Sequence, residues 1–373
     1  FWNRGFHQEA DFGEATFEDR VDFSNAIFHA EAKFWHAQIS ADCEFAEAIF
    51  ESEAQFERFN CTGEANMINT QFEALAMFRN CEFGASVDFS TQSEYTDRRT
   101  TETPSETVFS DRVVFSESQF HSQTAFSDVM FAANSEFEAT VFSGAATFDH
   151  SEFMSQTSFQ NATFRSECSF AGCQFVSGIA VRKDGSFTTT FFEPPILRDA
   201  DLSGVDFRDA PLSEAILSNA DLTDATLQGA DLSYTQLEGA LLNRSNCFNV
   251  NFTGAALNGS VFGDAQINDQ TEFGFDDTGR IGIHGFCIYD QRYTGHKSRA
   301  NDHPNRDQAA IATYLAIENL AAENGLSQLQ GQAFVRRQGV RRQQERRRIA
   351  NTDDLLDRIR ALLSWGLDTA SWA

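Results

Sequence analysis

The chain has 373 residues, of which 41% are hydrophobic and 13% aromatic, and Phe alone accounts for 39. This apolar content is enough to build a large core and excludes an intrinsically disordered chain, although 55 Asp and Glu against 28 Lys and Arg give a net charge of −27. The acidity disfavours a nucleic-acid-binding protein, and the sequence has no run of about 18 apolar residues that could cross a bilayer as a helix.

From its start, the sequence places a large apolar residue at alternating steps of six and five, as in Phe12, Phe17, Phe23 and Phe28. A small residue lies two positions before each of them. Neither a helix, with spacings of three and four, nor a continuous strand, with strict alternation, has this pattern. Residues two apart point to the same side of an extended segment, so the pattern predicts short extended pieces separated by corners. Four such pieces would close a square coil, and successive coils would stack at roughly 4.8 Å.

The rhythm is interrupted between Tyr95 and Phe109 by a polar stretch. We expect a loop at about residues 96–106, which either carries a binding function or is a tolerated insertion. The rhythm then resumes and runs to Phe175.

The next passage, from Gly178 to Pro195, is the least regular part of the array. Val181, Phe187 and Phe192 nevertheless keep steps of five or six. We therefore expect the coil to continue through it.

From Leu202 onwards the step is a strict five. Examples are the runs Ala200-Asp201-Leu202-Ser203-Gly204, Ala220-Asp221-Leu222-Thr223-Asp224 and Ala230-Asp231-Leu232-Ser233-Tyr234. These runs resemble the pentapeptide-repeat proteins, whose motif is A-(D/N)-L-x-x. The resemblance implies an all-β solenoid, a right-handed quadrilateral β-helix of about twelve coils, with the small residue and the Leu or Phe inside. The earlier alternation is similar to the Phe-rich branch of the family and implies about 22 residues per coil there, with two of four corners one residue longer.

We expect the β-helix to span residues 1–275, a cap or linker to follow over 276–306, and an α-helical region to occupy 307–373. Stacked rings and branched side chains would make the core by repetition. The positions expected in this core are Phe12, Phe17, Phe23, Phe28, Phe115, Phe120, Leu202, Leu222 and Leu232.

Seven cysteines show no disulfide framework, and six fall on inward positions where Cys acts as a small hydrophobe. This favours a reducing compartment. In the linker, His284, Cys287, His296 and His303 raise a zinc reading, but their spacing matches no standard tetrahedral set. We expect no metal and no cofactor.

The charge changes sharply near the C-terminus. Residues 1–306 hold 47 acids and 19 bases, whereas residues 307–373 hold 8 acids and 9 arginines. Apolar residues recur there at helical spacing, and Gly325 is a helix stop signal. The residues that we expect to contact a membrane or a partner are Arg336, Arg337, Arg341, Arg342, Arg346, Arg347, Arg348, Trp365 and Trp372.

An Arg-rich helix is equally typical of a solvated face or of a partner for the acidic solenoid. The run from Tyr314-Leu315 through Gly325 and Ala333-Phe334 to the arginines also resembles, weakly, the segment that joins pentapeptide repeats to an ion-channel-like membrane domain. Since the chain starts at Phe1 and stops at Trp372-Ala373 inside an apolar stretch, we expect a fragment of a longer protein that continues into membrane helices.

No nucleotide-binding, serine-hydrolase or zinc-protease motif is present, and carboxylates on the outside of a tube have no cleft to work in, so we expect no enzyme. The favoured function is a structural or protein-interaction rod, located in the cytoplasm or on the cytoplasmic face of a membrane. We expect it to bind a protein partner or itself through the C-terminal helices, to form a homo-oligomer, to contact an anionic membrane surface, and not to bind nucleic acid.

Two other functions stay open. Some pentapeptide-repeat proteins mimic duplex DNA and bind DNA gyrase, and an adhesive, calcium-stabilised rod is a third reading. Against mimicry, 25 Arg against 3 Lys in so acidic a chain is typical of a halophilic protein, whose charge maintains solubility in high salt.

Overall fold

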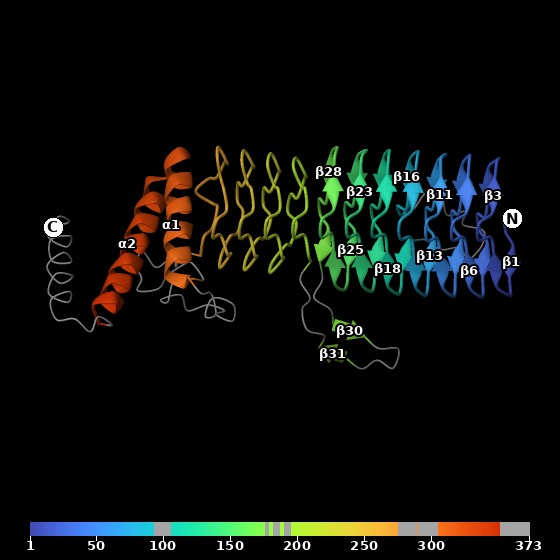
Figure 1. The fold of residues 1–373 in the computed structure, drawn as a ribbon, viewed down its shortest axis with the longest axis horizontal. Coiled ribbons are helices and arrows are strands. Elements are labelled where there is room, and N and C mark those ends of the chain that lie inside the picture. Colours follow the sequence, from blue (N-terminus) through green and yellow to red (C-terminus); the bar gives the residue numbers. More distant parts are fainter. Residues whose placement is uncertain are drawn as a thin grey trace.

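The computed structural model describes residues 1–92, 106–175, 179–181, 187–189, 195–274, 289 and 305–350. It is a straight rod with the N-terminus at one end and two helices at the other (Figure 1). The rod is a parallel β-solenoid whose two-residue strands form four sheets along its length. A separate two-stranded hairpin projects from its side (Figure 1).

Each long sheet takes one strand from every coil. The first holds β1 (Gly5–Phe6), β5 (Ile27–Phe28), β9 (Ile49–Phe50), β13 (Gln71–Phe72), β17 (Val108–Phe109), β21 (Met130–Phe131), β25 (Glu152–Phe153) and β29 (Gln174–Phe175). The second holds β2 (Ala10–Asp11), β6 (Ala32–Lys33), β10 (Ala54–Gln55), β14 (Ala76–Met77), β18 (Val113–Val114), β22 (Ser135–Glu136) and β26 (Thr157–Ser158). The third holds β3 (Thr16–Phe17), β7 (Gln38–Ile39), β11 (Asn60–Cys61), β15 (Glu82–Phe83), β19 (Gln119–Phe120), β23 (Val141–Phe142) and β27 (Thr163–Phe164). The fourth holds β4 (Val21–Asp22), β8 (Cys43–Glu44), β12 (Ala65–Asn66), β16 (Val87–Asp88), β20 (Thr124–Ala125), β24 (Ala146–Thr147) and β28 (Cys168–Ser169).

The register confirms the two coil lengths expected from the sequence. In the first part Gly5 pairs with Ile27, a step of 22 residues, and in the second part Ile196 pairs with Ile216, a step of 20. Left-handed corner residues explain the difference. They recur every eleven positions in the first part, for example at Asn25, His36, Glu47 and Arg58, so two corners of each coil lack one and are longer. In the second part they recur every five, at Asp199, Gly204, Asp209 and Glu214, so all four corners are tight.

Stacked aromatic rings fill the first part of the tube. Phe28 stacks on Phe6 at 4.7 Å and on Phe50 at 4.6 Å, and most of its neighbours repeat this arrangement. Of the expected core residues, those with no or almost no exposed surface are Phe23, Phe28, Phe115, Phe120, Leu202, Leu222 and Leu232. Phe12 and Phe17, which belong to the first described coil, are only partly buried.

The passage after Phe175 corrects one expectation. Ser158 pairs with Ile196 and Thr163 with Asp201, so the chain leaves the coil after Phe175 and rejoins it at Pro195. The segment in between contains an antiparallel hairpin of β30 (Ile179–Val181) and β31 (Phe187–Thr189), not coil corners.

The solenoid closes directly over this insertion. Phe170 stacks on Phe207 with the ring centroids 5.0 Å apart. The expected continuation of the coil through Val181 and Phe187 is therefore wrong. Phe192 lies outside the described residues. Seven coils join β1 to β29, and the bridges from Ile196 to Ala256 add three more before a last partial one. The expected count of about twelve coils was too high because it counted the insertion as coil.

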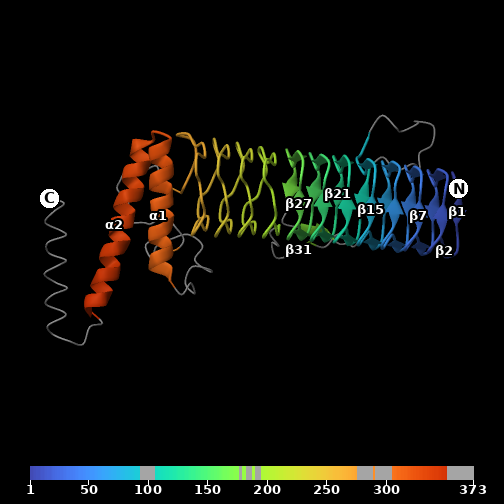
Figure 2. The ribbon, with the colours of Figure 1, turned by 45° about the horizontal axis from the view of Figure 1, so that its top comes forward.

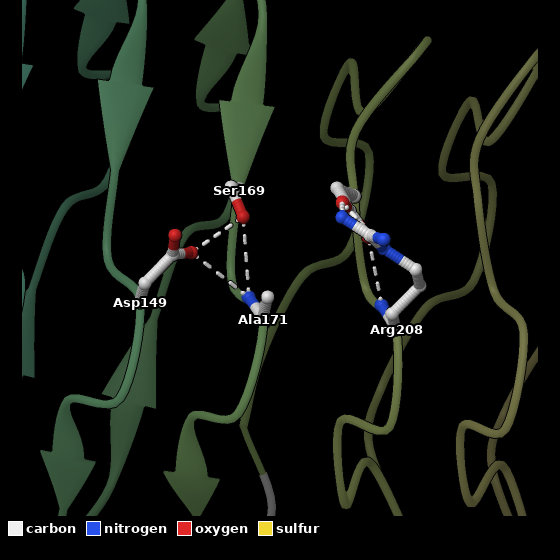
Figure 3. A network of polar contacts seen from close by, with 5 residues as sticks. Asp149, Ser169, Ala171 and Arg208 are labelled. Carbon is white, nitrogen blue, oxygen red and sulfur yellow. Dashed lines mark hydrogen bonds and ion pairs between the residues drawn. The ribbon is translucent and has the colours of Figure 1, made fainter.

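Polar contacts on the fourth face continue across this junction (Figure 3). The Asp149 carboxylate accepts hydrogen bonds from the Ser169 hydroxyl and, at 3.1 Å, from the Ala171 N–H one coil further on. In the next coil the Asp206 carboxylate accepts the Arg208 backbone N–H at 3.0 Å and also hydrogen bonds from the Arg208 guanidinium. These contacts therefore satisfy turn donors on both sides of the change from 22 to 20 residues.

The Asp or Asn of the repeat has a local structural role. The Asp221 carboxylate accepts the N–H of Thr223 at 2.9 Å, and Asp231 accepts the N–H of Ser233 at 3.0 Å. The same Asx turn occurs in the first part at Asp22 and Asp88. Part of the acidity of the rod therefore belongs to its turns.

The helical end consists of α1 (Arg306–Glu323) and α2 (Ser327–Ala350). Helix α1 lies across the last coil, transverse to the rod, and α2 packs on its outer side (Figures 1 and 2). Among the described residues, no helix is both long and apolar enough to cross a membrane.

Candidate interaction surface at the helical end

Helix α1 buries a broad stripe of small and apolar side chains between the coil and α2. These residues are Ala309, Ala310, Thr313, Tyr314, Ile317, Leu320 and Ala321. The last coil offers Ile267 and Phe273, which are 4% and 1% exposed. The helix therefore covers the apolar end of the tube, where a solenoid would otherwise present open strand edges.

One side chain also completes the hydrogen bonding of the last coil. The Asn324 amide donates from Nδ2 to the Ala265 carbonyl at 2.9 Å, and its Oδ1 accepts the Ile267 N–H at 3.1 Å. A residue of a following parallel strand would bond to the two residues flanking Gln266 in the same way. The Asn324 amide thus takes the place of one peptide unit of a further coil.

The linker is tied down at one described residue. The Tyr289 side chain is 2% exposed, and its hydroxyl donates to Glu238 Oε1 at 2.7 Å. Arg306 Nε donates to the Tyr289 carbonyl at 2.8 Å. Tyr289 therefore connects the start of α1 to a corner of the solenoid.

Two arginines fasten α2 to α1. Arg337 pairs with Glu318 at 2.7 Å, and both side chains are largely buried, at 11% and 16% exposed. Arg347 pairs with Asp307 at 2.8 Å. The partners of the first pair are 19 residues apart in sequence and those of the second pair 40. The two pairs therefore fix the antiparallel packing of the helices along most of their length.

The other arginines of α2 are placed differently. Arg336 is half-buried, whereas Arg341, Arg342, Arg346 and Arg348 are exposed. Val335, 51% exposed, lies on the same side as Arg342 and Arg346, since residues seven and eleven apart share a helix face. Arg341 and Arg348 are exposed further round the helix. We call the exposed surface of α2 that carries Val335 and these four arginines the arginine face. Glu345 is the one acidic residue of α2, so this face is strongly cationic.

The other expected sites are less informative. Trp365 and Trp372, the zinc candidates of the linker and almost all of the 96–106 loop lie outside the described residues. Within the described part of the chain, no three His, Cys, Asp or Glu side chains are grouped so that they could hold a metal ion. Six cysteines are free and buried, and burial raises the pKa of Cys81 and Cys247 to about 12, as expected for inert core thiols.

Comparison with known proteins identifies the repeat. Two family models described as pentapeptide repeats match the chain, one of nine copies over residues 6–49 and one of eight copies over residues 206–244. No curated protein matches.

Several solved structures resemble the solenoid. A trypsin-treated form of QnrB1, a plasmid-mediated fluoroquinolone resistance protein, is 16% identical and covers 55% of this chain and 91% of its own, with a TM-score of 0.32. HetL, a pentapeptide-repeat protein involved in heterocyst differentiation regulation from the cyanobacterium Nostoc sp. strain PCC 7120, is 14% identical over 72% of this chain and 90% of its own, with a TM-score of 0.22. Likenesses this distant carry no inference about activity or partners.

Proposed function

The chain is a pentapeptide-repeat protein, and on that premise we propose that it is a non-enzymatic interaction rod that docks through its arginine face onto an acidic protein surface. The observation that carries the proposal is the placement of charge. Seven arginines and one acid occupy a single helix at the tip of a rod whose residues 1–306 have 28 more acids than bases. Arg337 and Arg347, which pair with α1, are distinct from the exposed Arg341 and Arg342.

The acidic surface that we favour is the rod of a second copy. Figure 1 places the arginine-bearing helix and the N-terminal coils at opposite ends of the molecule, so α2 cannot reach those coils within one chain. A contact between the tip of one rod and the side of another uses two different surfaces and is heterologous. It would be steered by charge and weakened by salt.

A membrane is the runner-up. Anionic lipid attracts Arg clusters, at about 1 kcal/mol for each residue near the surface. The exposed apolar surface of α2 is small, however, since Val335 is its only large exposed apolar side chain among the residues whose burial is described. An arginine surface with an isolated apolar residue is more typical of a protein interface. The expectation of a cytoplasmic rod that continues into membrane helices after Ala373 belongs to this second proposal.

The test compares charge-reversed variants by sedimentation velocity at low and high salt. We expect Arg341→Glu/Arg342→Glu to remove an association that the unmodified chain shows at low salt and loses at high salt. The matched control is Arg208→Glu/Arg244→Glu, which changes the net charge equally on two rod arginines that are each 57% exposed. Equal association of all three proteins, or a monomer at every salt concentration, would overturn the proposal.

The alternatives give different results in parallel assays. Loss of binding to phosphatidylserine vesicles in the Arg341→Glu/Arg342→Glu protein, without any self-association, would favour the membrane. Inhibition of gyrase supercoiling at stoichiometric protein, equal in both variants, would favour DNA mimicry by the rod.

A further inference from the structure

Two histidines lie one above the other on the corner that follows the first sheet. His7 follows β1 and His29 follows β5, and the in-register pairing of these strands aligns the two side chains. Their rings are stacked, with centroids 4.5 Å apart and planes 4° apart. Both residues are exposed, so the core does not explain the pairing.

The protonation of His29 follows from its partner in the third coil. His29 Nδ1 lies 2.8 Å from Glu51 Oε2, and an ionised carboxylate can only accept, so Nδ1 carries the hydrogen. In the neutral imidazole the Nε2 atom of His29 then has a free lone pair. A carboxylate that orients a histidine in this way is the usual companion of a metal-binding imidazole.

The Nε2 atoms of both rings border one space beside Gly5. A Cβ atom on Gly5 would lie 3.5 Å from His7 Nε2 and 3.7 Å from His29 Nε2. Because residue 5 is glycine, that space holds no side chain. Two imidazole nitrogens thus border an open cradle on the outside of the rod.

We propose that His7 and His29 form a site for a late first-row divalent ion, such as Cu²⁺, Ni²⁺ or Zn²⁺, with Glu51 orienting His29 and water completing the coordination. Imidazole nitrogen is a preferred ligand of these ions. An ion bound at about 2.0–2.1 Å by each Nε2 must lie in the plane of both rings, so the two exposed rings have to turn out of their parallel stack to share it. No oxidation or reduction is involved.

The site would act as a clip between the first two coils. The first coil is the least buried part of the tube, since its Phe6, Phe12 and Phe17 are only partly buried. An ion held by one ligand from each coil binds the paired state of β1 and β5 and not the frayed one. Metal should therefore slow amide exchange at Ile27 and His29, whose N–H groups bond to the carbonyls of Arg4 and Phe6.

The experiment is a Cu²⁺ or Zn²⁺ titration of the full chain by calorimetry, with hydrogen exchange in parallel. The linker contains further His and Cys residues that could bind metal. The quantity compared is therefore the number of metal equivalents bound by each variant relative to the unmodified chain. We expect His7→Gln and His29→Gln each to lose the same one equivalent. Gly5→Val, which fills the cradle but keeps both ligands, should lose it too, and Glu51→Gln should weaken it by about 10- to 100-fold.

The matched control is His121→Gln. His121 Nε2 also lies near a carboxylate, 3.3 Å from Glu82 Oε1, but the neighbouring coils place Gly84 and Ser143 beside it. The His121→Gln protein should therefore bind as many metal equivalents as the unmodified chain. Unchanged stoichiometry in both His7→Gln and His29→Gln, or an equal loss in His121→Gln, would overturn the proposal, as would metal that leaves exchange at Ile27 and His29 unaltered.

Discussion

Replacing Asn324 by Ala tests how the helical end is joined to the solenoid. The substitution removes the acceptor of the Ile267 N–H and the donor to the Ala265 carbonyl, at 3.1 and 2.9 Å. Both residues are nearly buried, at 4% and 2% exposed, so water replaces these bonds poorly. An unsatisfied buried group costs about 1–3 kcal/mol, and we expect a loss of about 2 kcal/mol in the local stability of the last coil and α1. This corresponds to a roughly 30-fold rise in local opening.

Hydrogen exchange of the peptides that cover the last coil measures this opening directly, and urea unfolding gives the global effect. The control is Asn319→Ala, the same change at an exposed position of α1, which should stay within about 0.5 kcal/mol of the unmodified protein. If Asn324→Ala left the exchange of the Ile267 amide unchanged, or matched Asn319→Ala, the amide would not be completing the ladder.

Four further substitutions test the core and the charges by urea unfolding. Phe28→Ala should cost about 3–5 kcal/mol, and Phe6→Ala clearly less, because Phe28 is fully buried between two stacked rings whereas Phe6 is partly buried; equal losses would contradict the stacking argument. Thr313→Val should raise stability by about 1 kcal/mol, since the Thr313 hydroxyl is buried without a hydrogen-bond partner, and a loss would show that the hydroxyl has one. Burial, reinforced by Asp22 and Asp42 and opposed by Arg20, raises the pKa of Glu44 above its ordinary 4.5, so the ionised form weakens the fold. Glu44→Gln should therefore be the more stable protein near pH 7 and should lose this advantage as the pH falls towards 4.5, where the wild-type carboxyl becomes neutral; an advantage that grew on acidification would reverse the sign.

Most of the fold was predictable because each coil repeats the same local rule. The spacing of Phe12, Phe17 and Phe23 fixes which side chains point inward, and the change of step at Leu202 marks the change of coil length. The insertion after Phe175 was missed because Val181 and Phe187, which pair across the hairpin, are six residues apart and so match a step of the coil by coincidence. Only the pairing of Ser158 with Ile196 shows that the coil is bypassed.

The candidate functional residues divide in a similar way. The exposed arginines of α2 were found from composition alone, although the sequence could not separate Arg337 and Arg347, which bind α1, from the outward ones. The role of Asn324 depends on where α1 docks, and no local pattern announces it. His7, His29 and Glu51 did leave a signal, because they are spaced by 22 residues, the length of the coil. Writing the sequence in rows of 22 residues, one coil per row, puts the three residues in one column.

The same columns change the meaning of the acidity. An Asp at the repeat position accepts a hydrogen bond from a backbone N–H of the following turn, as Asp221 and Asp231 do. This structural role explains why the repeat has a hydrogen-bond acceptor there, without any ligand. Asn would serve the corner equally well, as Asn251 does with Thr253. The fold therefore requires an acceptor at this position but does not require a charged one. The preference for Asp over Asn needs another explanation, such as a basic partner, a saline habitat or DNA mimicry. The rod spreads the surplus of acidic charge over its whole length, whereas the cationic charge is concentrated on one helix at its tip. Such an asymmetry favours docking of the tip of one molecule on the acidic rod of another.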